Sequence, residues 1–394
     1  MDADMRKSVD KRAMAVLSAG HLFTDVNQGA VAALVPFLIA ERELSLAAAG
    51  SLVMAATLSS SIIQPLFGHF SDRKPLPVLM PLGLMLGGLG IALLGVAPGY
   101  PLIFACVVLS GLGVAAFHPE SARFANYVSG SRRARGMSFF SVGGNAGFAL
   151  GPVITTPLVF FFGLPGALFL IIPAFVMGLV LLSELPRLLA FRPKTVETAT
   201  KQSVGTPDRW GLFARMIGVV IVRSFVYFGL VTFVAEYYIR VLGSSPLLAN
   251  SALSVMLFAG GAGTLVMGPL ADRVGRRAVL AGSMLLLSPL IYAFILSGPS
   301  LGMLFLALVG AVTIGTFGVT VVMGQEYLPG RIGVAAGFTM GLSIGLGGVA
   351  APVLGALADS YGLSTMMLVL SASPLVGLAL AFSLPRGTGS HSGA

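Results

Sequence analysis

The sequence predicts an all-α membrane protein with many membrane-spanning helices, and three observations indicate this class. Of the 394 residues, 56% are hydrophobic and only 10% are charged, whereas soluble domains carry roughly 25% charged residues. Apolar runs recur along nearly the whole chain, and each is long enough to cross a hydrocarbon core of ~30 Å. Because the backbone of such runs must satisfy its hydrogen bonds internally, we expect them to be helices.

A repeat divides the chain into two related halves. A glycine-rich, basic break runs from Gly268 to Arg277 between two apolar runs, and a second copy begins at Gly68. An offset of 200 residues relates four pairs of positions: Gly68 and Gly268, Asp72 and Asp272, Arg73 and Arg273, and Pro152 and Pro352. This shared offset indicates a duplicated unit.

Twelve spans are expected, six in each half. In the first half they are predicted at residues 13–40, 46–70, 76–97, 101–127, 136–161 and 165–185. In the second half they are predicted at residues 212–240, 247–270, 278–297, 300–325, 332–357 and 363–384. We therefore expect an N-terminal six-helix bundle (1–185), a polar cytoplasmic linker (186–211) and a C-terminal six-helix bundle (212–394).

The basic residues predict the orientation. Most of them lie in the N-terminal tail, the even-numbered loops and the linker, while the opposite loops contain only Arg42 and Arg240. By the positive-inside rule, both termini are cytoplasmic, so the net charge of +9 reports topology and no nucleic-acid partner is expected. Cys106 is the only cysteine, which excludes an internal disulfide. We expect a monomer in the lipid bilayer of the bacterial inner (plasma) membrane.

Two six-helix halves related by a parallel repeat are typical of the major facilitator fold. The loop Gly-x-x-x-Asp-Arg-x-Gly-Arg-Arg at 268–277 resembles the signature loop of that superfamily. A glycine here is expected to let the flanking helices turn closely. Asp272 is expected to accept hydrogen bonds from the N-terminus of a neighbouring helix, and the arginines are expected to lie at the lipid headgroups. The expected gating residues of the two copies are Gly68, Asp72, Arg73, Gly268, Asp272, Arg273, Gly275 and Arg276. An ordinary positive-inside loop explains the arginines, but not the duplicated aspartate.

The first span carries polar residues on one face. His21, Asp25 and Gln28 recur at helical spacing, with Asn27 beside them. Charged residues inside a span cost ~2.5–3.5 kcal/mol, which makes Asp25 a functional candidate, with His21 as its partner and proton acceptor. Two alternatives remain open: a hydrogen-bonded pair that only fixes helix packing, and a pair of metal ligands, for which no third ligand is evident nearby.

The fourth span ends in Phe-His-Pro-Glu-Ser-Ala-Arg at residues 117–123. Pro119 is expected to bend this helix, and Glu120 can pair with Arg123. This motif and the glycine-rich run at 142–152 resemble the fosmidomycin resistance family of efflux transporters, as do His21-Leu-x-x-Asp25 and the segment 325–331. The resemblance implies export of an organic substrate in exchange for protons. The proton-coupling residues would then be Asp25, His21, His118 and Glu120.

The seventh span contains one charged residue well inside it, Arg223, which matches Phe23 by the repeat. Arg223 can pair with Asp25 in the empty state or bind an anionic phosphonate or carboxylate through bidentate hydrogen bonds. A purely structural ion pair is the alternative. The expected substrate-binding residues are Arg223, Tyr227, Gln28, Asn27 and Asn145.

Further residues are expected to act in gating, bending or packing. Glu326 is expected to form a gating or capping pair with Arg331 or with an arginine from another loop, and Glu236 an exposed helix pair with Arg240. The glycines of span five resemble an antiporter motif, and close packing without a role in transport is the alternative. The expected bending residues are Gly147, Gly151, Pro152 and Pro352.

Three functions follow from these residues. The first is a proton-coupled exporter of small organic compounds, including anions such as fosmidomycin, and the second is a proton symporter that takes up an organic acid. The third, a membrane-embedded metalloenzyme, would use His21, Asp25 and His118. No phosphate-binding loop or dinucleotide fingerprint is present, so ATP-driven transport is unsupported. The transporter interpretation, which we favour, expects no cofactor and no enzyme activity.

Overall fold

The computed structural model describes the chain except for residues 1–8, 65–66, 68–75, 131, 192–206, 332–333, 336–337, 340–342 and 386–394. Every regular element in the described part is helical. The chain forms two compact units, one of Met1–Leu44 and Ala55–Ala199, the other of Ser45–Met54 and Thr200–Ala394. The segment Ser45–Met54, which follows α1 after two intervening residues, is thus grouped with the second unit.

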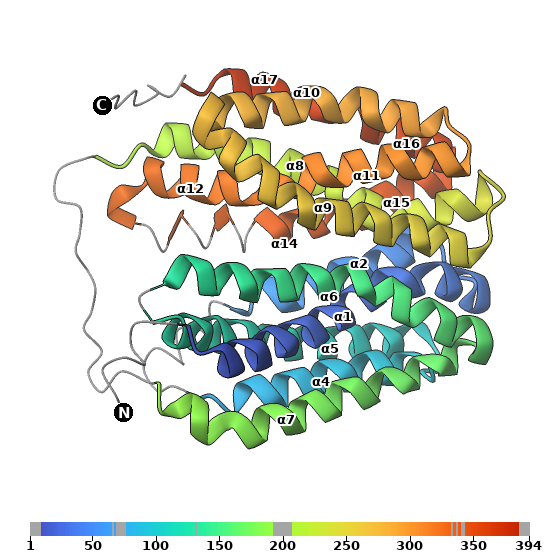
Figure 1. Ribbon diagram of the computed structural model, residues 1–394. Helices are drawn as coiled ribbons and strands as arrows, with labels where there is room; N and C mark the ends of the chain where they lie inside the picture. Colours follow the sequence, from blue (N-terminus) through green and yellow to red (C-terminus); the bar gives the residue numbers. More distant parts are fainter. Residues whose placement is uncertain are drawn as a thin grey trace. The chain divides into compact units, whose positions relative to one another are not determined.

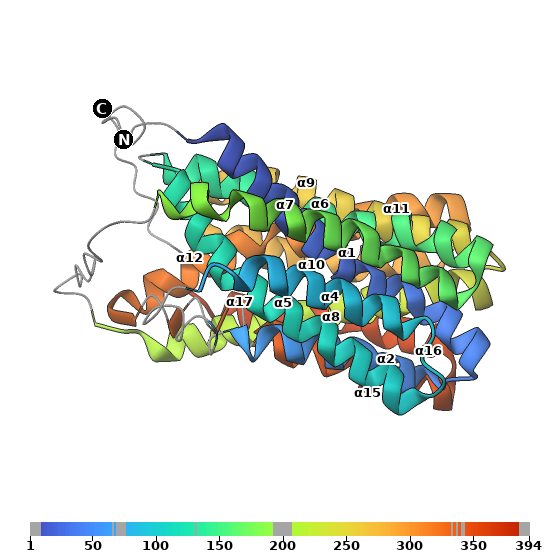
Figure 2. The same cartoon turned by 90° about the horizontal axis from the view of Figure 1, so that it is seen from below.

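The first unit is a bundle of near-parallel helices (Figures 1 and 2). Its elements are α1 (Lys11–Arg42), the end of α2 (Leu46–Ser61), α4 (Leu79–Leu94), α5 (Tyr100–Val128), α6 (Arg133–Phe162), η1 (Leu164–Leu170) and α7 (Ile171–Leu189). The packing of α1 along α6 is closest where glycines meet. A Cβ atom on Gly151 would lie 2.6 Å from the Cα of Gly29, so the two backbones touch and no side chain fits between them.

Polar contacts fix the start of α1 against the end of α7. Asp10 caps α1 by accepting the Ala13 N–H at 2.8 Å. The same carboxylate accepts from Arg187 of α7 at 2.9 Å, and Arg12 of α1 pairs with Glu184 of α7. An apolar core packs beneath these pairs, with Phe117 and Phe124 among its fully buried members.

The second unit contains the remaining helices (Figure 1). They are α8 (Trp210–Arg240), α9 (Pro246–Val274), α10 (Arg276–Ile295), α11 (Pro299–Gly315), α12 (Phe317–Tyr327), η2 (Pro329–Arg331), α14 (Ser343–Gly348), α15 (Ala350–Tyr361), α16 (Leu363–Ala372) and α17 (Pro374–Phe382). The first turn of α2 joins this unit, because the amides of Leu46 and Ala47 each donate to the Asp359 carboxylate of α15 at 2.9 Å.

The predicted all-α membrane fold is confirmed. Within the described residues, nine helical segments are long and apolar enough to cross a membrane, and two shorter apolar helices, Leu46–Ser61 and Leu79–Leu94, coincide with the second and third predicted spans. The eleventh predicted span falls on α14, α15 and residues partly outside the described ones. The sixth span extends beyond its predicted end at 185, because α7 continues to Leu189 with Pro186 inside it.

Candidate functional site

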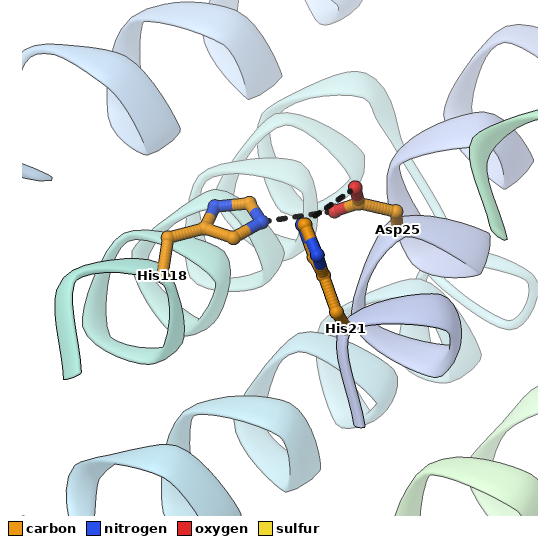
Figure 3. Close-up of side chains that lie close together, drawn as sticks. All are labelled: His21, Asp25 and His118. Carbon is orange, nitrogen blue, oxygen red and sulfur yellow. Dashed lines mark hydrogen bonds and ion pairs between the residues drawn. The ribbon is translucent and has the colours of Figure 1, made fainter. Parts of the chain in front are cut away.

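The structure brings three of the four predicted proton-coupling residues together (Figure 3). His21 and Asp25 lie one turn apart near the middle of α1, and His118 reaches Asp25 from α5. His21 Nε2 lies 3.3 Å from Asp25 Oδ2, and His118 Nε2 lies 3.1 Å from Asp25 Oδ1. The carboxylate therefore has an imidazole against each of its two oxygens.

Two further residues, which the sequence did not single out, complete the hydrogen bonding of this cluster. The main-chain carbonyl of Phe140 on α6 lies 2.9 Å from His21 Nδ1, and the Phe140 ring stacks on the imidazole with centroids 4.1 Å apart. The amide nitrogen of Gln64 lies 3.3 Å from His118 Nδ1. All four ring nitrogens of the two histidines thus have a partner, which fixes both rings.

A metal ion has also to be considered at this cluster. One ligand atom from each of His21, Asp25 and His118 lies within 4.8 Å of the others, so the three residues of the metalloenzyme hypothesis do lie together. The 3.1 Å contact between His118 and Asp25 is, however, a hydrogen-bond distance. Three ring nitrogens have hydrogen-bond partners, and the fourth, His21 Nε2, faces Asp25 Oδ2 at 3.3 Å. This arrangement fits the binding of protons.

The structure does not bring Glu120 to the cluster. Its side chain is fully buried, and Oε1 accepts the Leu76 N–H at 2.7 Å, just before α4. Oε2 lies 3.6 Å from Arg123, as the sequence predicted for this pair. Glu120 is therefore placed to hold the start of α4 against α5.

The predicted polar residues of the first unit are dispersed. Asn27 is buried and faces α4, where its amide nitrogen would lie 3.5 Å from a Cβ on Gly87. Gln28 is half-buried on the face of α1 that carries Asp25, while Asn145 is exposed on α6. Of these three residues, Gln28 alone shares a helix face with the cluster.

The second unit contains a different kind of polar site, centred on Arg223 near the middle of α8. The whole side chain is buried, with 0% of its surface exposed. Its guanidinium lies 3.9 Å from the ring centroid of Phe317, the first residue of α12, and Tyr227 packs edge-on against the same ring. The two predicted substrate-binding residues of α8 thus meet at Phe317.

The hydrogen bonds of Arg223 use only one of its three nitrogens. Nη1 donates to the hydroxyls of Thr316 at 3.3 Å and Thr320 at 3.2 Å. Both hydroxyls donate in turn to carbonyls of their own helix, so their lone pairs are available to the guanidinium. Nε and Nη2 have no hydrogen-bond partner, and no carboxylate pairs with Arg223 among the described residues.

The signature loop of the second unit differs from expectation. Gly275, with φ 92°, makes the turn between α9 and α10, whereas a Cβ on Gly268 would meet nothing within 4 Å. The Asp272 side chain is 74% exposed and lies 3.9 Å from Arg276, so in this structure it pairs within the loop instead of capping a helix. Arg273 is exposed. The predicted first copy, Gly68, Asp72 and Arg73, lies outside the described residues.

The predicted pairs at the ends of the second unit are partly rearranged. Glu326 pairs with Arg276, an arginine from another loop, which is the second of the two partners expected for it. Arg331 pairs with Asp208 at 3.3 Å, a partner that the sequence did not indicate. Glu236 does pair with Arg240, but it is 3% exposed, so the expectation of an exposed pair was wrong for the carboxylate.

The predicted bending residues lie inside continuous helices. Pro152 is internal to α6, and a Cβ on Gly147 would approach the Leu22 backbone of α1 at 2.8 Å. Pro352 lies in the first turn of α15, and a Cβ on Gly50 of α2 would come within 2.8 Å of its nitrogen. These positions therefore allow close helix packing.

Comparison with known proteins identifies the family. The model of the Major Facilitator Superfamily matches residues 17–352 and 216–393. The chain belongs to this superfamily. It is 33% identical over 377 residues to an uncharacterised transporter of this type, YfnC of Bacillus subtilis, and 30% identical over 376 residues to the fosmidomycin resistance protein of Escherichia coli. Each match covers 94% of this chain and 92% of the relative, which confirms the resemblance to the fosmidomycin resistance family.

Solved structures support the fold. The nucleoside transporter NupG aligns with a TM-score of 0.75 at 14% identity, covering 95% of this chain and all of that one. A D-xylose–proton symporter aligns with a TM-score of 0.72 at 17% identity, covering 95% and 98% of the two chains. The protein is therefore a multi-pass membrane transporter with the twelve-helix major facilitator fold.

The sequence analysis did not identify several residues of both sites. Thr316 and Thr320 lie one turn apart in the tenth span, a spacing that could have marked a polar face. Gln64 is a single polar side chain near the end of an apolar run, which gives a weaker signal. The Phe140 contact is made by the main chain, so no side-chain pattern could have revealed it.

Proposed function

We propose that this protein is a proton-coupled antiporter that exports small organic anions, including phosphonates such as fosmidomycin, by alternating access. Protons would bind at the His21–Asp25–His118 cluster and the anionic group of the substrate at Arg223. The protein would lie in the bacterial inner membrane as a monomer with both termini in the cytoplasm.

The observation that carries this proposal is the bonding of Arg223. A buried charge is costly unless a partner offsets it, and within the described residues this guanidinium has only hydroxyl and aromatic partners. Its open donors, Nε and Nη2, lie on one edge of the guanidinium. This edge matches two oxygens of a carboxylate or phosphonate, which can accept two parallel hydrogen bonds.

The surroundings of Arg223 also fit a transport site. Irregular backbone inside a membrane is tolerated where it lines a cavity or a binding site, and transporters often bind substrate at interrupted helices. The break between α11 and α12 places Thr316 and Phe317 at the guanidinium. Tyr227 would complete the aromatic wall, and the Arg276–Glu326 pair would act in gating.

Export is supported by the relationship to the fosmidomycin resistance protein. The test is fosmidomycin susceptibility and accumulation in a bacterial strain that lacks its own exporter of this drug. We expect the wild-type protein to lower accumulation and protect the cells, and Arg223→Ala to abolish protection. Arg215→Ala, which removes an exposed arginine of the same helix, is the matched control and should protect as the wild type does.

The outcomes separate the alternatives. Sensitisation of the cells would contradict export and indicate uptake. Full protection by Arg223→Ala, at equal membrane abundance, would contradict anion binding at this residue. A stoichiometric metal in the purified protein, lost on His118→Ala, would contradict the assignment of the cluster to protons and favour a metal-dependent protein.

A further inference from the structure

We propose that the exchangeable proton is carried on Nε2 of His21, paired with Asp25, and that His118 remains neutral as a fixed Nε2–H tautomer. This inference rests on the proposed proton coupling, and it names the atom of the cluster that gains and loses the proton.

The protonation of His21 follows from its partners. The Phe140 carbonyl can only accept a hydrogen bond, so Nδ1, 2.9 Å away, must carry a hydrogen. A neutral His21 would then direct the lone pair of Nε2 at Asp25 Oδ2, 3.3 Å away. Two acceptors at this distance repel each other, so a proton is required between them. Imidazole is intrinsically the stronger base, which places that proton on the ring.

The partners of His118 require no additional proton. Nε2 lies 3.1 Å from Asp25 Oδ1 and must donate to it. Nδ1 faces the amide nitrogen of Gln64 at 3.3 Å, which donates to a ring lone pair. Both contacts of His118 are therefore satisfied by the neutral ring, and Gln64 acts as the positioning residue that selects this tautomer.

The charge of the cluster supports one proton and not two. A single imidazolium offsets the charge of Asp25, whereas a second would leave a net positive charge in a buried site. The two imidazoles lie 5.1 Å apart between centroids, close enough for two cations to repel. On α5, Glu120 faces Leu76 and Arg123 instead, and α6 contributes Phe140 and Gly144. The described residues therefore supply no other charge that faces the pair.

Loss of the proton would have a structural consequence. The His21 ring is held by the Phe140 carbonyl and by stacking, so the Asp25 carboxylate is the group that can move away. Gly144 of α6 lies directly against the pair, since a Cβ there would collide with the His21 ring and lie 2.7 Å from Asp25 Oδ2, so the carboxylate would move away from α6. His118 would keep its hydrogen bond to the other oxygen. The proton on His21 thus decides where the carboxylate points.

The test is ¹⁵N NMR of the histidine rings in the purified full-length protein in nanodiscs, over a pH series. The chemical shift of each ring nitrogen reports whether it carries a hydrogen. Among the four histidines, His21 and His118 are assigned with His21→Asn and His118→Asn. We expect His21 to change from doubly protonated to neutral as pH rises, and His118 to be a neutral Nε2–H tautomer throughout.

A doubly protonated His118 beside a neutral His21, or two neutral rings at every pH, would overturn the inference. Gln64→Glu supplies a second readout, because a carboxylate facing Nδ1 should favour doubly protonated His118 in the ¹⁵N spectrum. Gln64→Met is the control and should not increase the protonation of His118. If His21 and His118 show the expected ring states but the protein transports nothing, only the proposed function is contradicted. If the protein transports its substrate but His118 carries the extra proton instead of His21, only this inference is contradicted.

Discussion

The polar sites of the two units are both buried among apolar helices, but their charges are satisfied differently. In the first unit, Asp25 has a histidine against each carboxylate oxygen, and main-chain and amide groups bond the outer ring nitrogens. In the second unit, Arg223 has only hydroxyls and an aromatic ring, with two nitrogens open. The first site is complete without a ligand, whereas the second is not.

We propose that this difference separates two tasks within a duplicated architecture. Imidazoles can exchange protons in the physiological pH range, so a closed network around Asp25 suits proton binding. A guanidinium is not expected to release its proton, so an open donor edge suits an external anion. The repeat supplies the helical framework of both halves, and the chemistry differs because the residues at matching positions differ, as Phe23 and Arg223 do.

The largest effect is expected for Asp25→Asn. This change removes the charge that pairs with His21 and accepts from His118, so a proton on His21 Nε2 would lose its counter-charge in a buried site. We expect proton-coupled transport in vesicles to fall to the level of protein-free vesicles and its pH dependence to disappear. Unchanged transport and pH dependence would remove the cluster from the mechanism. Glu41→Gln, at an exposed position near the end of α1, is the comparison for loss of a carboxylate.

Arg223→Lys tests the open donor edge of the second unit. Lysine keeps the positive charge but cannot form two parallel hydrogen bonds, each charge-assisted bond being worth about 1.5–3 kcal/mol. Affinity for an anionic substrate should fall about 10- to 100-fold, measured by calorimetry on the purified protein. The histidine ring states of the first unit should not change. Wild-type affinity in the lysine variant would show that charge alone is recognised.

A smaller effect is expected when the space beside the proton site is filled. In Gly144→Ala the new Cβ would collide with the His21 ring and lie 2.7 Å from Asp25 Oδ2, which forces these side chains or α6 to shift. Overpacking of this kind costs about 1–3 kcal/mol, so we expect proton-coupled transport to fall about tenfold. Gly282→Ala on α10, where a Cβ meets nothing within 4 Å, is the control. Equal activity of both variants would contradict the role of Gly144.

The smallest effect is expected for Glu326→Gln, which breaks an exposed pair with Arg276 outside both buried sites. Exposed ion pairs contribute about 0–1 kcal/mol, so transport should change less than about fivefold. The effect should shrink further at high salt, because ions screen exposed charges. The double variant Arg276→Glu with Glu326→Arg should restore the wild-type rate if the pair acts in gating. A loss as large as that of Asp25→Asn would show that the loop has a central role.

The fold was predictable because hydropathy and the repeat leave few alternatives. Long apolar runs must be helices, and loops such as the one at Gly275 fall where those runs end. Details that depend on packing were not predictable. Pro186 predicts an end to the sixth span, yet α7 continues through it. The tenth span is predicted as one unbroken apolar run, yet the helix is interrupted at Thr316.

The sequence identified those site residues whose side chains are energetically costly inside a membrane span. Asp25, His118 and Arg223 stand out because polar and charged groups are rare inside spans. Their partners could not be inferred in the same way, since threonines and main-chain carbonyls are common in such helices. The sequence also did not reveal the direction in which the Glu120 side chain points. Glu120 lies two residues from His118, yet it faces the start of α4.

The central claim is that proton movement is coupled to anions through Arg223. The most direct measurement is substrate-induced proton movement in proteoliposomes, wild type against Arg223→Ala, with phosphonates, carboxylates and cationic dyes as substrates. We predict that only the anions move protons and that the substitution abolishes the response. Proton movement driven by the cationic dyes and unaffected by Arg223→Ala would contradict the account.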